Sequence, residues 1–151
     1  MGCEEVVVKI QQLPEGEGLA LPSYHTSGSS GMDLCAAIPD TLILEAGQTV
    51  LVPAGFRIEV PPGYEAQVRP RSGLALKHSL TLLNSPGTID SDYRGPVQII
   101  LHNAGKQPFT IRRGDRIAQL VIAPVCRATL RLVDSLEQTE RGPGGFGHTG
   151  V

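Results

Sequence analysis

The chain has 151 residues and a formal net charge of -2, with no run of like charges. A near-neutral balance argues against a sequence-independent nucleic-acid binder, and no apolar run approaches the ~18 residues needed to cross a membrane. Cysteines occur at positions 3, 35 and 126 without metal-ligand spacing, which favours unpaired thiols in a reducing compartment. With no secretory signal at its start, the sequence predicts a soluble cytoplasmic protein with neither a nucleic-acid nor a membrane partner.

Short strands dominate the predicted secondary structure. The 18 glycines and 12 prolines interrupt the chain too often for long helices, and polar and apolar residues alternate in many short runs. Predicted strands, in chain order, cover residues 6–10, 41–44, 49–53, 56–60, 64–69, 97–102, 109–111, 116–122 and 128–133. Residues 72–80 form the one predicted helix, which Ser72 caps or leads. The pattern indicates an all-β sandwich or barrel of jelly-roll type.

The last part of the chain differs in composition. Half of residues 141–150 are glycine, and Phe146 is their one large apolar side chain. Such a segment cannot bury enough surface to fold alone. We therefore expect a β domain over residues 1–136 and a flexible arm over 137–151. This arm could be a flap that closes over an anionic, aromatic ligand. The alternative is a frayed terminus without a function.

Residues 84–95 hold the densest set of functional groups. Asn84 supplies a carboxamide, Asp90 a carboxylate and Tyr93 a phenol, within a stretch rich in glycine and proline between two apolar runs. Tight turns hold short polar side chains rigidly at one end of a sheet. This arrangement favours recognition of a small flat ligand, although a polar hairpin without chemistry has the same composition.

Three further segments carry candidate residues. Arg71, Ser72 and Gly73 join a strand to the helix and could cradle an anion, or merely begin the helix. Gln119, on an apolar strand, requires a hydrogen-bonding partner. Asp33 lies between small and apolar residues, where an aspartate is more often a turn former than a metal ligand.

Together, residues 30–36, 70–75, 84–95, 114–119 and 141–150 resemble the five ordered motifs of the homotrimeric dUTPases. The resemblance spans most of the chain beyond the first 30 or so residues. It implies an all-β, jelly-roll-like distorted β-barrel with one short helix, assembled as a homotrimer with shared active sites. The implied reaction is Mg²⁺-dependent hydrolysis of dUTP to dUMP and pyrophosphate, which keeps uracil out of DNA and supplies dUMP for thymidylate synthesis.

The resemblance also implies residue roles. Asp90 is the general base that activates a water for attack on the α-phosphorus. Uracil is bound by Asn84 and by backbone groups around Thr88, Ile89, Asp90 and Gln98, and Tyr93 packs against the deoxyribose. Arg71, Ser72, Gly73 and Gln119 hold the phosphates, and Asp33 holds hydrated Mg²⁺ through water. In the arm, Phe146 stacks on uracil and Arg141 binds the γ-phosphate, and the substrate also contacts Gly147, His148 and Thr149.

One position departs from the family motif, since His148 replaces the more common serine. An imidazole can still donate a hydrogen bond to a phosphate. Two rival functions are a dCTP deaminase of the same fold and a non-catalytic trimeric module. Deaminases of this fold carry a glutamate on the strand after the third motif, and residues 97–103 contain no carboxylate here. A pure scaffold would not need Asp90, Tyr93, Arg141 and Phe146 together.

Overall fold

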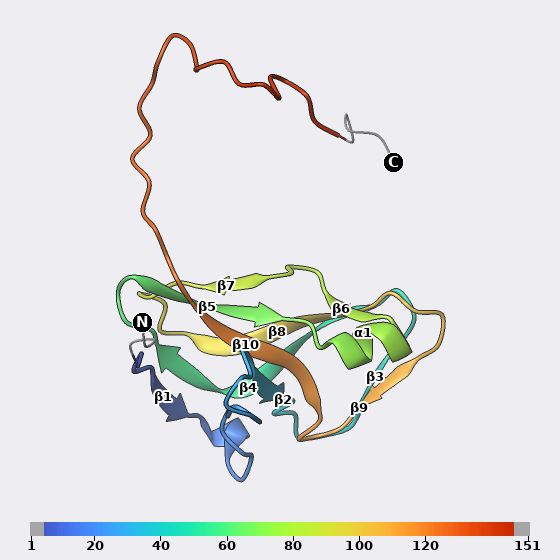
Figure 1. The fold of residues 1–151 in the computed structure, drawn as a ribbon. Coiled ribbons are helices and arrows are strands. Elements are labelled where there is room, and N and C mark those ends of the chain that lie inside the picture. Colours follow the sequence, from blue (N-terminus) through green and yellow to red (C-terminus); the bar gives the residue numbers. More distant parts are fainter. Residues whose placement is uncertain (1–4, 147–151) are drawn as a thin grey trace.

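A computed structural model describes residues 5–146 (Figure 1). Its elements are β1 (Lys9–Gln12), the short 3-10 helix η1 (Pro14–Gly16), β2 (Met32–Cys35), β3 (Leu42–Leu44), β4 (Thr49–Glu59), β5 (Tyr64–Arg69), α1 (Ser72–His78), β6 (Leu80–Leu82), β7 (Gly87–Ile89), β8 (Pro96–Asn103), β9 (Phe109–Ile111) and β10 (Arg116–Pro124). No helix in this part of the chain is long and apolar enough to span a membrane.

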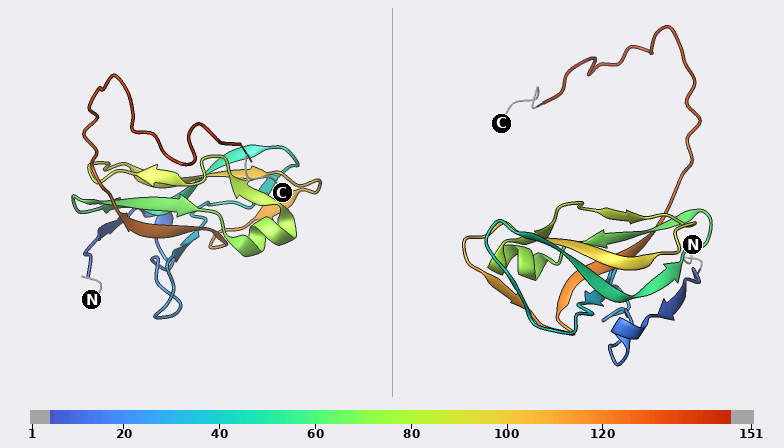
Figure 2. Two further views of the ribbon diagram at one scale, coloured as in Figure 1. Left: turned by 45° about the horizontal axis from the view of Figure 1, so that its top comes forward. Right: turned by 180° about the vertical axis from the view of Figure 1, so that it is seen from behind.

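The strands form two four-stranded antiparallel sheets and one two-stranded ribbon (Figures 1 and 2). The first sheet has the order β1-β4-β8-β6, the second has the order β2-β10-β5-β7, and β3 pairs with β9. Aliphatic side chains fill the core, and Leu34, Ile99, Leu101, Ile111 and Ile117 are almost completely buried. This architecture confirms the predicted all-β, jelly-roll-like class with one short helix.

The two strands predicted at 49–53 and 56–60 are one strand, β4. A glycine allows them to join, because Gly55 has a φ of +81° and the register with β8 shifts between Pro53 and Arg57. A β-carbon on Gly55 would also meet the Cα of Gly16 at 2.5 Å. The local pattern contained both halves but did not show that the glycine is a bulge within one strand.

Other boundaries differ for physical reasons. β1 begins at Lys9 instead of residue 6, because Lys9 pairs with Glu59, the last residue of β4. The helix ends at His78, since Ser79 adopts a left-handed φ of +55°. Ser72 leads the helix but does not cap it: Arg71 is the N-cap, and no side chain caps the helix start. Three strands of three or four residues, β2, β6 and β7, were not predicted.

The strand predicted at 128–133 is wrong for the chain taken by itself, because the structure has no strand there. Leu130 and Leu132 are 95% and 99% exposed. Within the described residues, the last backbone hydrogen bond to the sheets runs from Val125 N–H to the Gly63 carbonyl, at 2.8 Å. Beyond it the segment runs away from both sheets (Figure 1). A strand requires a partner edge, and one chain offers none here.

Candidate active site

Strand pairing in the second sheet aligns predicted site residues. Asp33 on β2 lies opposite Gln119 on β10, so the two side chains share one face of the sheet. The adjacent residues Leu34, Ala118 and Leu120 are buried in the core. Asp33 and Gln119 therefore lie on the outer face, as their partial exposure shows.

Asp33 is the centre of a charged cluster. Arg71 Nε lies 3.0 Å from its Oδ1, and Arg116 Nη1 and His25 Nε2 lie 3.3 and 2.9 Å from its Oδ2. Arg71 Nη1 also donates to the Arg116 carbonyl at 3.0 Å. These contacts hold the Arg71 guanidinium in place and leave its Nη2 group without a hydrogen bond to any described residue.

Gln119 is held by one hydrogen bond and lies close against Gly31. Its Nε2 donates to the Pro70 carbonyl at 3.0 Å, and its Oε1 lies 2.5 Å from the position that a β-carbon on Gly31 would occupy. Gln119 and Ser72 line a hollow of about 480 Å³, together with Gln67, Arg69, Pro70, Ser85 and Pro86. No other group comes within 4 Å of a β-carbon built on Gly73, so the space beside the helix start is open.

A second hollow of about 230 Å³ brings together four of the five predicted site residues of the third motif. It is lined by the predicted residues Thr88, Ile89, Asp90, Tyr93 and Gln98, together with Leu51, Pro96, Val97 and Ile100. Strand β7 is at the edge of its sheet, and β6 pairs with β8 only from Leu101 to Asn103. Backbone N–H and C=O groups on the open side of β7 and of the first half of β8 are therefore available to a ligand.

The turn after β7 fixes Tyr93. Its N–H donates to the Asp90 carbonyl at 3.1 Å, and its hydroxyl donates to the Pro96 carbonyl at 3.1 Å. Gly95 lies in contact with the phenol, and a β-carbon there would overlap the Tyr93 hydroxyl. The Asp90 side chain remains exposed and borders both this hollow and a neighbouring one that contains Glu65, Asp92 and Arg127.

Some predicted site residues are not brought together. Asn84 packs beside Gly87, with its Nδ2 3.0 Å from a β-carbon built there, and does not line the second hollow. Arg141 Nε donates only locally, to the Gly144 carbonyl at 2.8 Å, and Phe146 is exposed. Gly147, His148 and Thr149 lie outside the described residues. The two hollows share no lining residue, so one chain presents the predicted site in separate parts.

Sequence reasoning missed His25, Arg69 and Arg116, which the structure places in or beside the Asp33–Gln119 row. Strand register could have revealed Arg69 and Arg116, but register depends on which strands pair, and His25 lies in the loop before β2. Burial, and secondarily the Asp33 carboxylate, raise the pKa of the nearby Cys35 thiol, which disfavours the reactive thiolate form.

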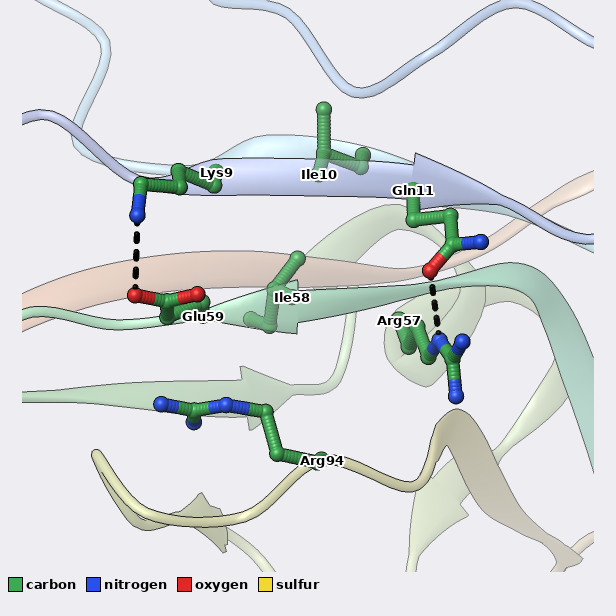
Figure 3. A pocket seen from close by; sticks show the side chains of 7 residues that line it. All are labelled: Lys9, Ile10, Gln11, Arg57, Ile58, Glu59 and Arg94. Carbon is green, nitrogen blue, oxygen red and sulfur yellow. Dashed lines mark hydrogen bonds and ion pairs between the residues drawn. The ribbon is translucent and has the colours of Figure 1, made fainter.

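A further hollow, of about 450 Å³, lies beside β1 and β4 and contains no predicted site residue (Figure 3). Its polar groups bond to one another: Lys9 Nζ lies 3.1 Å from Glu59 Oε1, and Arg57 Nε donates to Gln11 Oε1 at 2.8 Å. Arg94 also borders it. Neither Arg57 nor Arg94 forms an ion pair with a described residue, so the hollow keeps a net positive charge. It contains none of the motif residues and is therefore a poor candidate for the active site.

Comparison with known proteins identifies the fold and the family. The dUTPase of Staphylococcus bacteriophage 80alpha, solved with dUpNHpp, is similar to this chain with 25% sequence identity and a TM-score of 0.86, covering 96% of this chain and 99% of the phage chain. A dUTPase variant from phage phi11 of S. aureus, described as coordinating a structural Mg(II) ion, shares the fold with 23% identity and a TM-score of 0.77 over 87% of this chain and 99% of its own.

The family model for dUTPase matches residues 18–150. The chain therefore belongs to the dUTPase family, and it is an enzyme that hydrolyses dUTP.

Proposed function

We propose that dUTP is hydrolysed to dUMP and pyrophosphate at active sites assembled from separate copies of the chain in a homotrimer. The separation of the two hollows within one chain is the observation that carries this proposal. The extended segment after Val125 supports it, because its exposed leucines lack a partner surface within the described chain. Residues 137–151 then form the arm that closes over a neighbouring site.

The hollow beside β7 and β8 is the proposed uracil site. Backbone groups near Thr88, Ile89 and Gln98 can hydrogen-bond to the edge of the base, and a pocket with fixed donors and acceptors rejects cytosine by leaving buried groups unpaired. Asn84 would turn toward the base from the adjoining loop. The Tyr93 ring, fixed by its bond to the Pro96 carbonyl, packs against the deoxyribose and leaves no room for a 2′-hydroxyl.

The hollow beside β5 and β10 is the proposed phosphate site. Ser72 and Gln119 line it, Gly73 leaves space at its border, and Arg71 is fixed beside it by Asp33. These donors can bind phosphate oxygens, with the Arg71 guanidinium giving the strongest contact.

Asp33 offers one carboxylate beside the proposed phosphate site, and its oxygens already contact Arg71, Arg116 and His25, so its contact with Mg²⁺ would run through water. Residues 5–146 contain no group of three or more His, Cys, Asp or Glu side chains that could enclose a metal. Mg²⁺ usually keeps several waters and binds substrate phosphates, so a single carboxylate acting through water suffices. When bound to the triphosphate, the ion neutralises charge on the phosphate oxygens, and Asp33 orients its water shell.

Asp90 is the proposed general base. Its exposed carboxylate lies at the junction of two hollows, where it can accept a proton from a water molecule. The water oxygen bonds to the α-phosphorus, the bond from that phosphorus to the bridging oxygen breaks, and pyrophosphate leaves. Arg141 binds the γ-phosphate, Phe146 stacks on uracil, and Gly147, His148 and Thr149 complete the closed arm.

In the cell this reaction keeps uracil out of DNA and supplies dUMP for thymidylate synthesis, in the cytoplasm. Deamination of dCTP is disfavoured because β8 carries no carboxylate. The test is pyrophosphate release from dUTP, dTTP, dCTP and UTP in the presence of Mg²⁺. We expect turnover of dUTP only, and robust ammonia release from dCTP would contradict the proposal.

Asp90→Asn tests the base directly. The loss of proton acceptance should lower kcat by about 10²–10⁴-fold. Asp40→Asn, which removes an exposed carboxylate outside both hollows, is the matched control and should retain turnover. Unchanged turnover in Asp90→Asn would show that another group activates the water.

A further inference from the structure

We infer that Arg69 is a further substrate-binding residue, with its guanidinium on the phosphate chain of dUTP, and that Gln67 positions it. This inference rests on the phosphate site proposed above. None of the five motif roles includes either residue.

Strand register places Arg69 in the row of phosphate-site side chains. Arg69 on β5 lies opposite Gln119 on β10, which itself lies opposite Asp33 on β2. Directly opposite residues in antiparallel strands present their side chains on the same face, about 5 Å apart. Val68, the neighbour of Arg69, is buried in the core, so Arg69 lies on the outer face with Gln119.

The hollow that contains Ser72 and Gln119 also contains Arg69. Its lining includes no other charged residue of either sign. Among the described residues, no carboxylate lies within ion-pairing distance of the Arg69 guanidinium. The hollow therefore has an uncompensated positive charge, which favours an anion.

Gln67 fixes the orientation of that charge. Its Oε1 accepts hydrogen bonds from both Nε and Nη2 of Arg69, at 3.0 and 2.6 Å, and its own Nε2 donates to Glu65 Oε1. Glu65, Gln67 and Arg69 occupy every second position of β5, so all three side chains lie on its outer face. Two bonds to one acceptor fix the guanidinium plane, and the Nη1 group makes no hydrogen bond to any described residue.

Such a guanidinium is suited to phosphate. Its donors match the spacing of phosphate oxygens, and holding it before binding reduces the rotamer entropy lost when the ligand arrives. The triphosphate carries several negative charges, so a further cation near Arg71 would strengthen its binding. Arg69 thus supplies a second cation. It lies on one side of Gln119, and Asp33 lies on the other.

The experiment compares two ligands in the full-length protein. Arg69→Gln should weaken binding of the non-hydrolysable analogue dUpNHpp about tenfold or more, as expected for a lost charge-assisted hydrogen bond. Binding of deoxyuridine, which has no phosphate, should be unchanged. Gln67→Leu should weaken dUpNHpp binding by a smaller factor in the same direction, again without an effect on deoxyuridine.

Arg57→Gln is the matched control, because Arg57 is also an exposed strand arginine held by a glutamine, but on the other sheet (Figure 3). It should bind both ligands like the wild-type protein. Wild-type affinity of Arg69→Gln for dUpNHpp, or an equal loss for both ligands, would overturn the inference alone. Failure of the wild-type protein to bind dUpNHpp would overturn the proposed function, and this inference with it.

Discussion

Gly31 and Gln119 are so close that no side chain fits between them: a β-carbon on Gly31 would lie 2.5 Å from the Gln119 Oε1 atom. Gln119 could retreat only by giving up the hydrogen bond from its Nε2 to the Pro70 carbonyl. The glycine in the first motif therefore maintains the position of a glutamine in the fourth.

Gly31→Ala should displace Gln119 from the phosphate site. We expect the KM for dUTP to rise about tenfold, the effect of losing one hydrogen bond to a charged group, with a smaller change in kcat. Steady-state kinetics measures both parameters. Gly28→Ala is the control, since a β-carbon there meets nothing within 4 Å. Equal kinetics in the two variants would show that Gln119 does not contact substrate.

Gly95→Ala should push the Tyr93 ring out of position, because the new β-carbon would overlap the phenol. We expect the ratio of kcat/KM for dUTP over UTP to fall about tenfold as space opens for a 2′-hydroxyl. Tyr93→Phe keeps the ring and loses only the bond to the Pro96 carbonyl, so it should discriminate better than Gly95→Ala. A ratio unaffected by Gly95→Ala would contradict the sugar-binding role.

Mixed assemblies should restore activity if sites are shared. Asp90→Asn and Arg71→Ala are each expected to be nearly inactive alone. When the two variants are refolded together in equal amounts, they should recover about a quarter of wild-type turnover. In a symmetric trimer with shared sites, about a quarter of the sites receive an intact Asp90 from one chain and an intact Arg71 from another. Turnover of the mixture is compared with that of each parent. No recovery would mean that Asp90 and Arg71 of the same chain act together.

Removal of residues 141–151 should leave a folded assembly with severely reduced turnover. The contacts that Arg141 and Gly142 make are local to the tail, so the sheets lose no hydrogen bond from the described residues 141–146. We expect kcat/KM to fall by at least about 100-fold and Tm to change by less than about 2 °C. Calorimetry and sedimentation measure folding and assembly. Dissociation of the truncated protein would instead assign the tail a structural role.

Local sequence patterns predicted half-buried strands well. Residues 64–69 alternate because β5 has one face in the core and one outside, and the observed strand has the predicted bounds. The segment 128–133 shows a similar pattern, but a strand also requires an edge to pair with, which no local pattern can supply. β6 and β7 were missed because residue 80 was assigned to the predicted helix and residues 87–89 to a turn-rich segment.

The motifs located candidate residues, but their grouping could not be predicted. Asp33 and Gln119 are 86 positions apart and become neighbours only through the register of β2 and β10. Arg69 was treated as an ordinary strand residue for the same reason, since its neighbours on β10 are remote in the sequence. Non-local pairing thus determines which polar groups share a hollow.

The hydrogen bond between Val125 and Gly63 makes the following segment a tether of considerable reach. Extended at about 3.3 Å per residue, the stretch from Val125 to Arg141 spans about 50 Å. The effective concentration at a distant target falls only slowly as such a tether lengthens. A few flexible residues inserted near position 138 would therefore have little effect on closure of the arm over the active site. A stiff helical insert of equal length would instead direct Phe146 away from the uracil site.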